Sequence, residues 1–220
     1  MARFSVSRIA ALIPGDWRQI FCIRFEKSAI ENVDSLTEFI QTRSAYVAQT
    51  SLYGYLKTRM GTRYQQVFED DKFLPSINKA KWQTYGACLS DLTVFAAALT
   101  GSEDRLRKNE ISGLAQKCFK AAVLQTFDDA EANEVRAEIV ERFEARIKQT
   151  PWPNAAIGEN AFTSSPKVLL ESAPIADELK AQDIEIVTNS IRFRWRDVRE
   201  QLRKRIDRDA ICAEWQAIER

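Results

Sequence analysis

Histidine is absent from all 220 residues of this chain. Its absence excludes Ser-His-Asp and Cys-His catalytic triads, because both use the imidazole as general base. It also removes the commonest metal ligand and the commonest general base near neutral pH. Any catalysis would depend on carboxylates, Lys, Tyr or Cys. We expect no metal ion and no cofactor, and we favour a non-enzymatic function.

Closely spaced cysteines are missing as well. Cys22, Cys88, Cys118 and Cys212 are far apart, so the spacings typical of zinc sites and thioredoxin-like motifs do not occur. Each lies among apolar neighbours in a predicted helix, which predicts free, buried thiols in a reducing compartment. Glycine-rich nucleotide-binding motifs, the P-loop, and the hydrolase and kinase signatures are also absent.

Glycine and proline are scarce, with seven and six residues. Strand-rich folds with many tight turns usually need more of both. The hydrophobic content of 45% and the charged content of 29% are those of an ordinary globular protein. The net charge of +1 provides no global attraction to nucleic acid or to a membrane surface. These features predict a soluble, all-α protein whose overall charge does not favour nucleic-acid binding.

A long apolar run is missing too, and a membrane span needs about 20 such residues. Residues 1–13 contain no acidic side chain, but the apolar run Ile9–Ile13 is shorter than that of a secretory signal. This start weakly resembles a mitochondrial presequence, and the cytoplasm is the expected location. Short helices are predicted over 3–12 and 16–29.

The stretch Trp82–Leu99 carries a single charged residue, Asp91. Its apolar residues recur at steps of three and four, which predicts a helix buried on most sides. A buried carboxylate must be paired, hydrogen-bonded or protonated. Asp91 therefore has two interpretations, an acid–base or ligand-binding group in a pocket, or a structural ion pair with an Arg of a neighbouring helix.

We predict one domain with a compact bundle of six to eight helices. Its main part, 1–149, is built on helices near 34–66 and 77–100. Residues 150–175 hold four of the six prolines and are predicted to be an irregular connecting segment. Residues 176–220 are predicted to form a helical hairpin that packs back on the bundle. The buried seam of the last long helix is predicted to be Ile184, Val187, Ile191, Trp195, Val198, Leu202 and Ile206.

An arginine row follows this seam. Arg192, Arg196, Arg199 and Arg203 are spaced by four, three and four residues, so they share one face of the helix. The row is a candidate surface for an acidic partner protein or for the phosphate backbone of a nucleic acid. The other interpretation is a solvated face, in which Arg196 pairs with Glu200 four residues on.

A second candidate surface lies on the helix near 34–66. Arg43, Tyr46, Tyr53 and Lys57 lie on one face, and aromatic rings interleaved with cations can hold an anionic group. With Asp91, these residues are the candidate ligand-binding set. The other interpretation places the rings in the core, with the cationic side chains reaching solvent.

The leading hypothesis is therefore a helical interaction or adaptor protein that binds another protein. The alternative is a bundle that binds a small anionic or amphipathic ligand between its helices. A third hypothesis is an enzyme without His that uses Asp91 with a Tyr or Lys.

Overall fold

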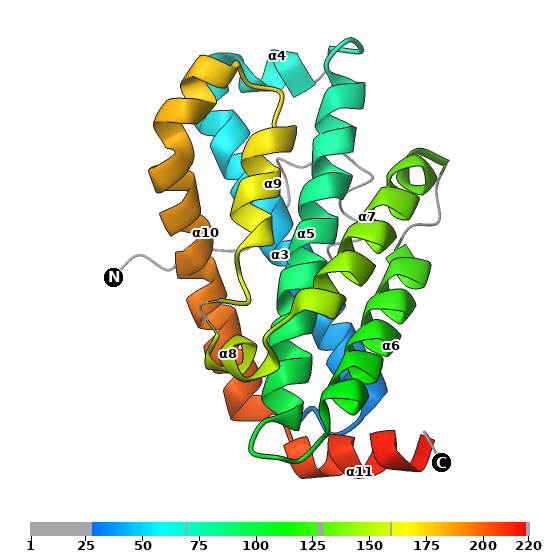
Figure 1. The fold of residues 1–220 in the computed structure, drawn as a ribbon. Coiled ribbons are helices and arrows are strands. Elements are labelled where there is room, and N and C mark those ends of the chain that lie inside the picture. The colour runs from blue at the N-terminus through cyan, green and yellow to red at the C-terminus, as the bar shows by residue number, and fades with distance from the viewer. Residues whose placement is uncertain (1–27, 69, 127–129, 159, 219–220) are drawn as a thin grey trace.

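The structure is a computed structural model that describes residues 28–68, 70–126, 130–158 and 160–218. All regular elements in these ranges are helices, and they pack into one elongated bundle (Figure 1). The predicted helix 3–12 and residues 16–27 of the predicted helix 16–29 lie outside the described residues, and Ser28 and Ala29 are not helical. The elements are α3 (Val33–Met60), η1 (Gly61–Arg63), α4 (Tyr64–Phe68), α5 (Leu74–Gly101), α6 (Lys108–Thr126), α7 (Ala130–Gln149), α8 (Trp152–Ile157), α9 (Ser164–Ser172), α10 (Asp177–Arg205) and α11 (Arg208–Ile218).

The all-α bundle is confirmed. Nine α-helices occur in the described part of the chain, against six to eight predicted. The difference arises from short helices such as α4 and α8, whose few residues carry too little periodicity to distinguish a helix from a connection.

Helix α5 is the centre of the bundle, as the apolar stretch predicted. It contacts α3, α6, α7, α8, α9 and α11, and it is buried over most of its length. Gly86 allows one of these contacts, because a Cβ atom there would lie 2.5 Å from the Ile139 side chain of α7. Within the described residues, no helix has an apolar stretch of the length that a membrane crossing requires.

Helix α3 begins at a capping box. The Asn32 side chain accepts a hydrogen bond from the backbone N–H of Ser35 at 2.7 Å, and the Ser35 hydroxyl accepts one from the Asn32 backbone at 3.2 Å. Two backbone N–H groups that the helix itself leaves unpaired are thereby satisfied. The helix ends at Gly61, whose φ of 58° is a conformation that glycine adopts at little cost.

The two ends of the described chain are joined at the break between α10 and α11. Ile30 accepts a hydrogen bond from Asp207 at 2.8 Å and donates one to the carbonyl of Arg205 at 2.9 Å. Ile30 and Ile206 thereby form an isolated parallel bridge. Helix α11 then lies across the end of the bundle instead of folding back along α10 as the predicted hairpin would (Figure 1).

The segment 150–175 is not irregular throughout, because it contains α8 and α9. Helix α9 lies against α5 on one side and α10 on the other. Helix α10 runs unbroken from Asp177 to Arg205 and is the long helix whose buried seam was predicted. As a result, α9 and α10 form an outer layer over α3 and α5 (Figure 1).

Candidate functional site

Asp91 lies at the centre of the bundle, with none of its surface exposed. Its Oδ1 atom accepts a hydrogen bond from Nη1 of Arg146 on α7, at 2.6 Å. The same nitrogen donates to the Ser90 hydroxyl at 2.9 Å, and Nη2 donates to the Ala161 carbonyl at 2.5 Å. The geometry is that of the structural ion pair, the second of the two interpretations of this carboxylate.

Asp91 also caps the N-terminus of α9. The backbone N–H of Ser165 donates to Oδ2 at 2.8 Å, and that of Ser164 donates to Oδ1 at 3.2 Å. Such charge-assisted bonds to a helix start are stronger than neutral ones. The Ser165 hydroxyl then accepts a bond from Nε1 of Trp195 on α10, at 3.0 Å. Asp91 thus connects four helices, α5, α7, α9 and α10.

This arrangement leaves the carboxylate of Asp91 with protein partners on both oxygens, from Arg146 and from the start of α9. A general acid or base must exchange a proton with a reacting group. Asp91 is fully buried and both of its oxygens already accept hydrogen bonds from the protein. We therefore interpret Asp91 as the anchor that holds α9 in place, and this removes the chief support for the enzyme hypothesis.

The thiols of the described cysteines offer no nucleophile either. Cys88, Cys118 and Cys212 are free and buried, as predicted, and Cys22 lies outside the described residues. Burial raises the pKa of each thiol, to about 11 for Cys118. Because the thiolate is the reactive form, these cysteines are suited to packing and not to covalent chemistry.

The other predicted ligand residues form two groups instead of one pocket. Arg43 is buried beside α10, with its guanidinium 5.5 Å from the centre of the Phe39 ring. Burial lowers its pKa, and the nearby Arg205 lowers it further. Tyr46 influences the pKa values of both Arg43 and Arg194, so it belongs to this group.

Tyr53 and Lys57 belong to the second group, towards α4. The Tyr53 ring stacks on Phe68 with centroids 4.7 Å apart, and Lys57 lies over the ring of Tyr64 at 5.0 Å. Burial and then the neighbouring Tyr64 raise the pKa of Tyr53. These contacts favour the packing interpretation of the aromatic face.

The arginine row on α10 divides into two pairs. Arg203 donates to the Ile157 carbonyl at 3.1 Å, and Arg199 lies 5.7 Å from the Phe162 ring. These two arginines of α10 therefore contact the segment that contains α8 and the residues after it. Arg192 and Arg196 are exposed. The described ion pairs join Arg196 to the adjacent Asp197 at 3.9 Å instead of to Glu200.

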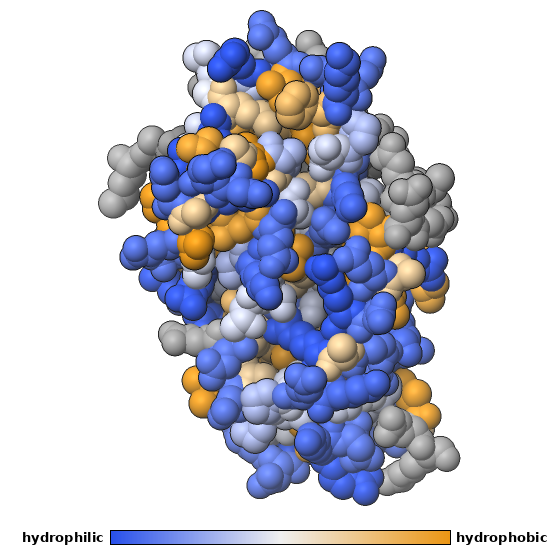
Figure 2. All heavy atoms as spheres, turned by 45° about the horizontal axis from the view of Figure 1, so that its top comes forward, coloured by the Kyte–Doolittle hydropathy of each residue, from blue (hydrophilic) through white to orange (hydrophobic). Residues whose placement is uncertain are grey.

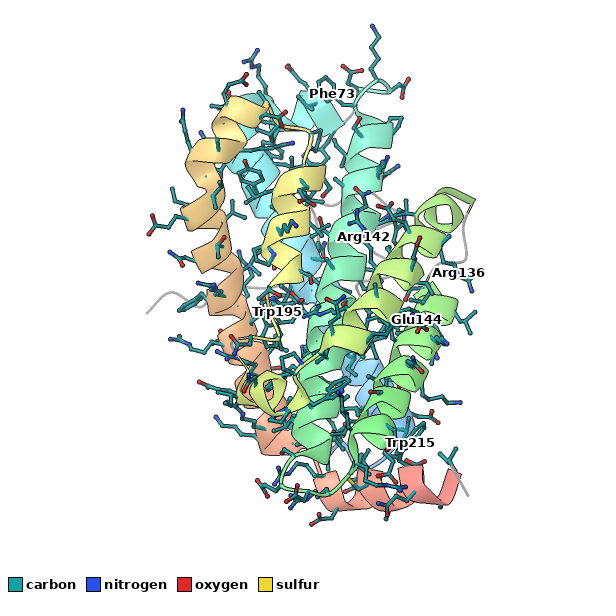
Figure 3. The ribbon with its side chains drawn as sticks, in the orientation of Figure 1. Phe73, Arg136, Arg142, Glu144, Trp195 and Trp215 are labelled. Atoms are coloured by element: carbon teal, nitrogen blue, oxygen red, sulfur yellow. The ribbon has the colours of Figure 1, made fainter. Side chains whose placement is uncertain are left out.

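Two grooves border α9, one on each side. The α7–α9 groove, with a volume of about 470 Å³, has α5 as its floor and α7 and α9 as its walls. Its polar and charged residues include Ser90, Ser164 and Arg142, the last of which is labelled in Figure 3. Asp91 lies beneath this groove without lining it.

The second, the α9–α10 groove, has a volume of about 670 Å³ and mostly apolar walls. Pro166, Leu170 and Ile184 provide apolar surface, and Arg192 belongs to the lining. Figure 2 shows hydrophobic residues gathered on the left of the molecule, where α10 lies in Figure 1. Neither groove is lined by any of the five residues predicted to bind a ligand.

Two features of the groove linings were not predicted from the sequence: the exposed Ile184 and the walls formed by α9. Ile184 was predicted to lie in the buried seam, and 56% of its surface is exposed. Val187, Ile191 and Trp195 of that seam are buried as predicted. The walls that α9 contributes were missed because residues 150–175 were predicted to be irregular; the apolar run around Leu169 was the one signal of a buried helix face there.

A further polar cluster ties the first half of α10 to α3. Asp183 accepts hydrogen bonds from Nε of Arg59 at 2.6 Å and from the Tyr55 hydroxyl at 2.9 Å, and Nη2 of Arg59 contacts its other oxygen. The Arg59 hydrogen bond is the main cause of the lowered pKa of Asp183. Burial, and then the carboxylate, raises the pKa of Tyr55 to about 12.

We expect this cluster to make stability depend on acid pH. Because the pKa of Asp183 is lower in the folded protein, its contribution is complete above the unfolded value of about 3.9. The contribution is lost as pH falls through the lower, folded pKa. The difference in melting temperature between wild type and Asp183→Asn should be constant near neutrality and disappear in acid. Asp71→Asn, at an exposed turn, is the control.

The described residues contain no group of three or more His, Cys, Asp or Glu side chains that could hold a metal ion. The structure therefore presents a buried anchor at Asp91 and two grooves that share α9 as a wall. Comparison with protein-family models, with curated proteins and with solved structures finds no match to this chain.

Proposed function

We propose that this chain is a non-enzymatic interaction protein that binds another protein through the outer face of α9 and α10. One observation carries the proposal. Of the eight large hydrophobic side chains that are exposed in the described residues, four lie on α10. Their exposed fractions are 37% for Leu179, 56% for Ile184, 70% for Ile186 and 59% for Phe193. Apolar surface gathered in this way is typical of a binding surface.

The extent of this surface favours a protein over a small molecule. Ile184 lines the α9–α10 groove, but Ile186 and Phe193 lie outside it on the same helix. A small ligand in the groove would leave both of these side chains in water. Ile186 and Phe193 are two and nine positions from Ile184, so they lie on the opposite side of α10 from the groove. Only a partner large enough to contact both sides of this helix would cover all three side chains.

The charge of α10 indicates that the partner is acidic. From Arg192 to Arg205 the helix has seven basic residues against two acidic ones. Lys180 and Lys167 in the groove lining already pair with Asp177 and Glu171. Arg192 makes no ion pair within the described residues, so its charge is free to meet a carboxylate of a partner.

Photocrosslinking in the protein's own cells tests this proposal. A photoreactive amino acid in place of Ile184 should give a discrete crosslinked product with an acidic, amphipathic segment of one other protein. Adding Arg192→Glu should reduce that product about tenfold, since the reversed charge repels the acidic partner. The crosslinked peptides would be identified by mass spectrometry.

The matched control places the same amino acid at Lys120, an exposed residue of α6 outside the described grooves. Equal products from both positions, a product that survives Arg192→Glu unchanged, or no product at all would each contradict the proposal. A crosslink between two copies of this chain would also contradict it, because the partner would then not be a different protein.

A further inference from the structure

The α7–α9 groove has small or apolar residues at its base and charges on both walls. Gly86, Ala87 and Ser90 of α5 form the floor. Glu138 and Arg142 line the α7 wall. The charged residues of the α9 wall are Lys167 and Glu171.

The two walls run in opposite directions along α5. On α7, Glu138 is 3.4 Å from Gln83 and Arg146 contacts Ser90, so residue numbers rise together on α5 and α7. On α9 they run oppositely, because Ser165 contacts Asp91 whereas Ser172 lies 3.4 Å from Thr84.

This register separates the charges of the groove by sign. Arg142 and Lys167 both belong to the Ser90 end, and Glu138 and Glu171 both belong to the Gln83 end. On each wall the basic and acidic residues are four positions apart, which is about 6 Å along a helix. When the ion pairs along the two walls are open, the groove is positive at the Ser90 end and negative at the Gln83 end.

The charges are now paired along each wall, and these pairs are weakly held. Arg142 contacts Glu138 at 2.6 Å with 54% and 43% of the two side chains exposed. Lys167 lies 3.8 Å from Glu171, and both are at least half exposed. Exposed pairs of this kind contribute little to stability, so a ligand can replace them at small cost.

From this charge pattern we propose that the α7–α9 groove binds a small zwitterion whose opposite charges are about 6 Å apart. The anionic group lies between Arg142 and Lys167 near the Ser164 hydroxyl. The cationic group lies between Glu138 and Glu171, and the connecting chain covers Ala87. Dipeptides and ω-amino acids have this chemistry. The site shares Lys167 and Glu171 with the lining of the α9–α10 groove, and its α5 and α7 residues belong to the α7–α9 groove alone.

Isothermal titration calorimetry with δ-aminovalerate tests the proposal. The matched probes are valerate, which lacks the amine, and pentylamine, which lacks the carboxylate. We expect the dissociation constant of δ-aminovalerate to be at least about tenfold lower than that of either probe, because each charged group adds a hydrogen-bonded ion contact. Glycylglycine should bind as δ-aminovalerate does if the site accepts peptides. Weaker binding of glycylglycine than of either single-charge probe would contradict the dipeptide class.

Substitutions in the groove assign the two ends. Arg142→Gln should weaken the binding of valerate and δ-aminovalerate about tenfold and leave the binding of pentylamine unchanged. Glu138→Gln should weaken the binding of pentylamine and δ-aminovalerate about tenfold and leave the binding of valerate unchanged. Arg192→Gln, in the other groove, is the control and should change none of them. Circular dichroism checks that each variant is folded. Absence of binding by δ-aminovalerate, equal binding of all three probes, or a loss caused by Arg192→Gln would overturn the proposal.

Discussion

Asp91→Ala is expected to lower the free energy of unfolding by about 3 kcal/mol, measured by urea denaturation. Removing one partner of a buried ion pair costs about 3–5 kcal/mol, because the other charge stays in the interior unpaired. The Arg146 side chain keeps 18% of its surface exposed, so we expect the lower part of that range. The backbone N–H groups of Ser164 and Ser165 would also lose their acceptor.

Glu171→Ala is the matched control for this measurement. Glu171 is also an acidic partner of a described ion pair, but 54% of its side chain is exposed. An exposed pair contributes about 0–1 kcal/mol, so we expect little change. If Asp91→Ala destabilised the protein no more than Glu171→Ala, Asp91 would not be an anchor.

Trp195→Ala is expected to lower the free energy of unfolding by at least as much as Asp91→Ala, by about 3–5 kcal/mol. Trp195 of α10, which is labelled in Figure 3, has 1% of its surface exposed, and its ring lies 4.7 Å from that of Phe162. Its Nε1 donates to the Ser165 hydroxyl, the next link from Asp91. Alanine would leave a cavity between α10 and α9 and remove that hydrogen bond. The same urea titration measures the effect.

Trp195→Phe separates the two contributions. Phenylalanine keeps an aromatic ring against Phe162 but has no N–H group for Ser165. We expect a loss smaller than that of Trp195→Ala, including about 1 kcal/mol from the hydrogen bond. If Trp195→Phe and Trp195→Ala lowered the free energy of unfolding equally, the aromatic ring that phenylalanine keeps would contribute nothing, and the packing contribution would be contradicted.

The long helices could be predicted from sequence because their signals are local. The eighteen residues from Trp82 to Leu99 carry one charge, and apolar spacing of three and four residues fixes a helical face without any tertiary information. Helix α3, in contrast, has apolar residues on several sides. Helix α5 forms where it was expected, and α3 begins as expected but ends at Met60, because Gly61 interrupts the helix predicted to run to about residue 66.

Helix α9 could not be predicted in the same way. It has nine residues, too few to be stable alone, and Pro166 lies in its first turn. The acidic group at its N-terminus is Asp91, which is 74 positions from Ser165 in the chain. No local pattern reveals a cap that comes from another helix. Because α9 forms a wall of both grooves, the residues that line them could not be predicted from the sequence either.

The arginine row shows the same limit for binding residues. Spacing placed Arg192, Arg196, Arg199 and Arg203 on one face, but it did not reveal which of them the protein uses internally. The chain around Ile157 and Phe162 contacts two of them, and that contact is set by tertiary packing. Ile184 is exposed for a related reason, because it lines the open α9–α10 groove, which tertiary packing creates.

Amide hydrogen exchange in α9 is the most direct measurement, because both proposed binding surfaces depend on Asp91 holding this helix in place. In wild type, the amides of Ser164 and Ser165 should exchange slowly. In Asp91→Asn, exchange across α9 should become faster while α6, which lies away from Asp91, is unchanged. Equal α9 exchange in the two proteins would contradict the anchor role and would return Asp91 to the list of candidate acid–base residues.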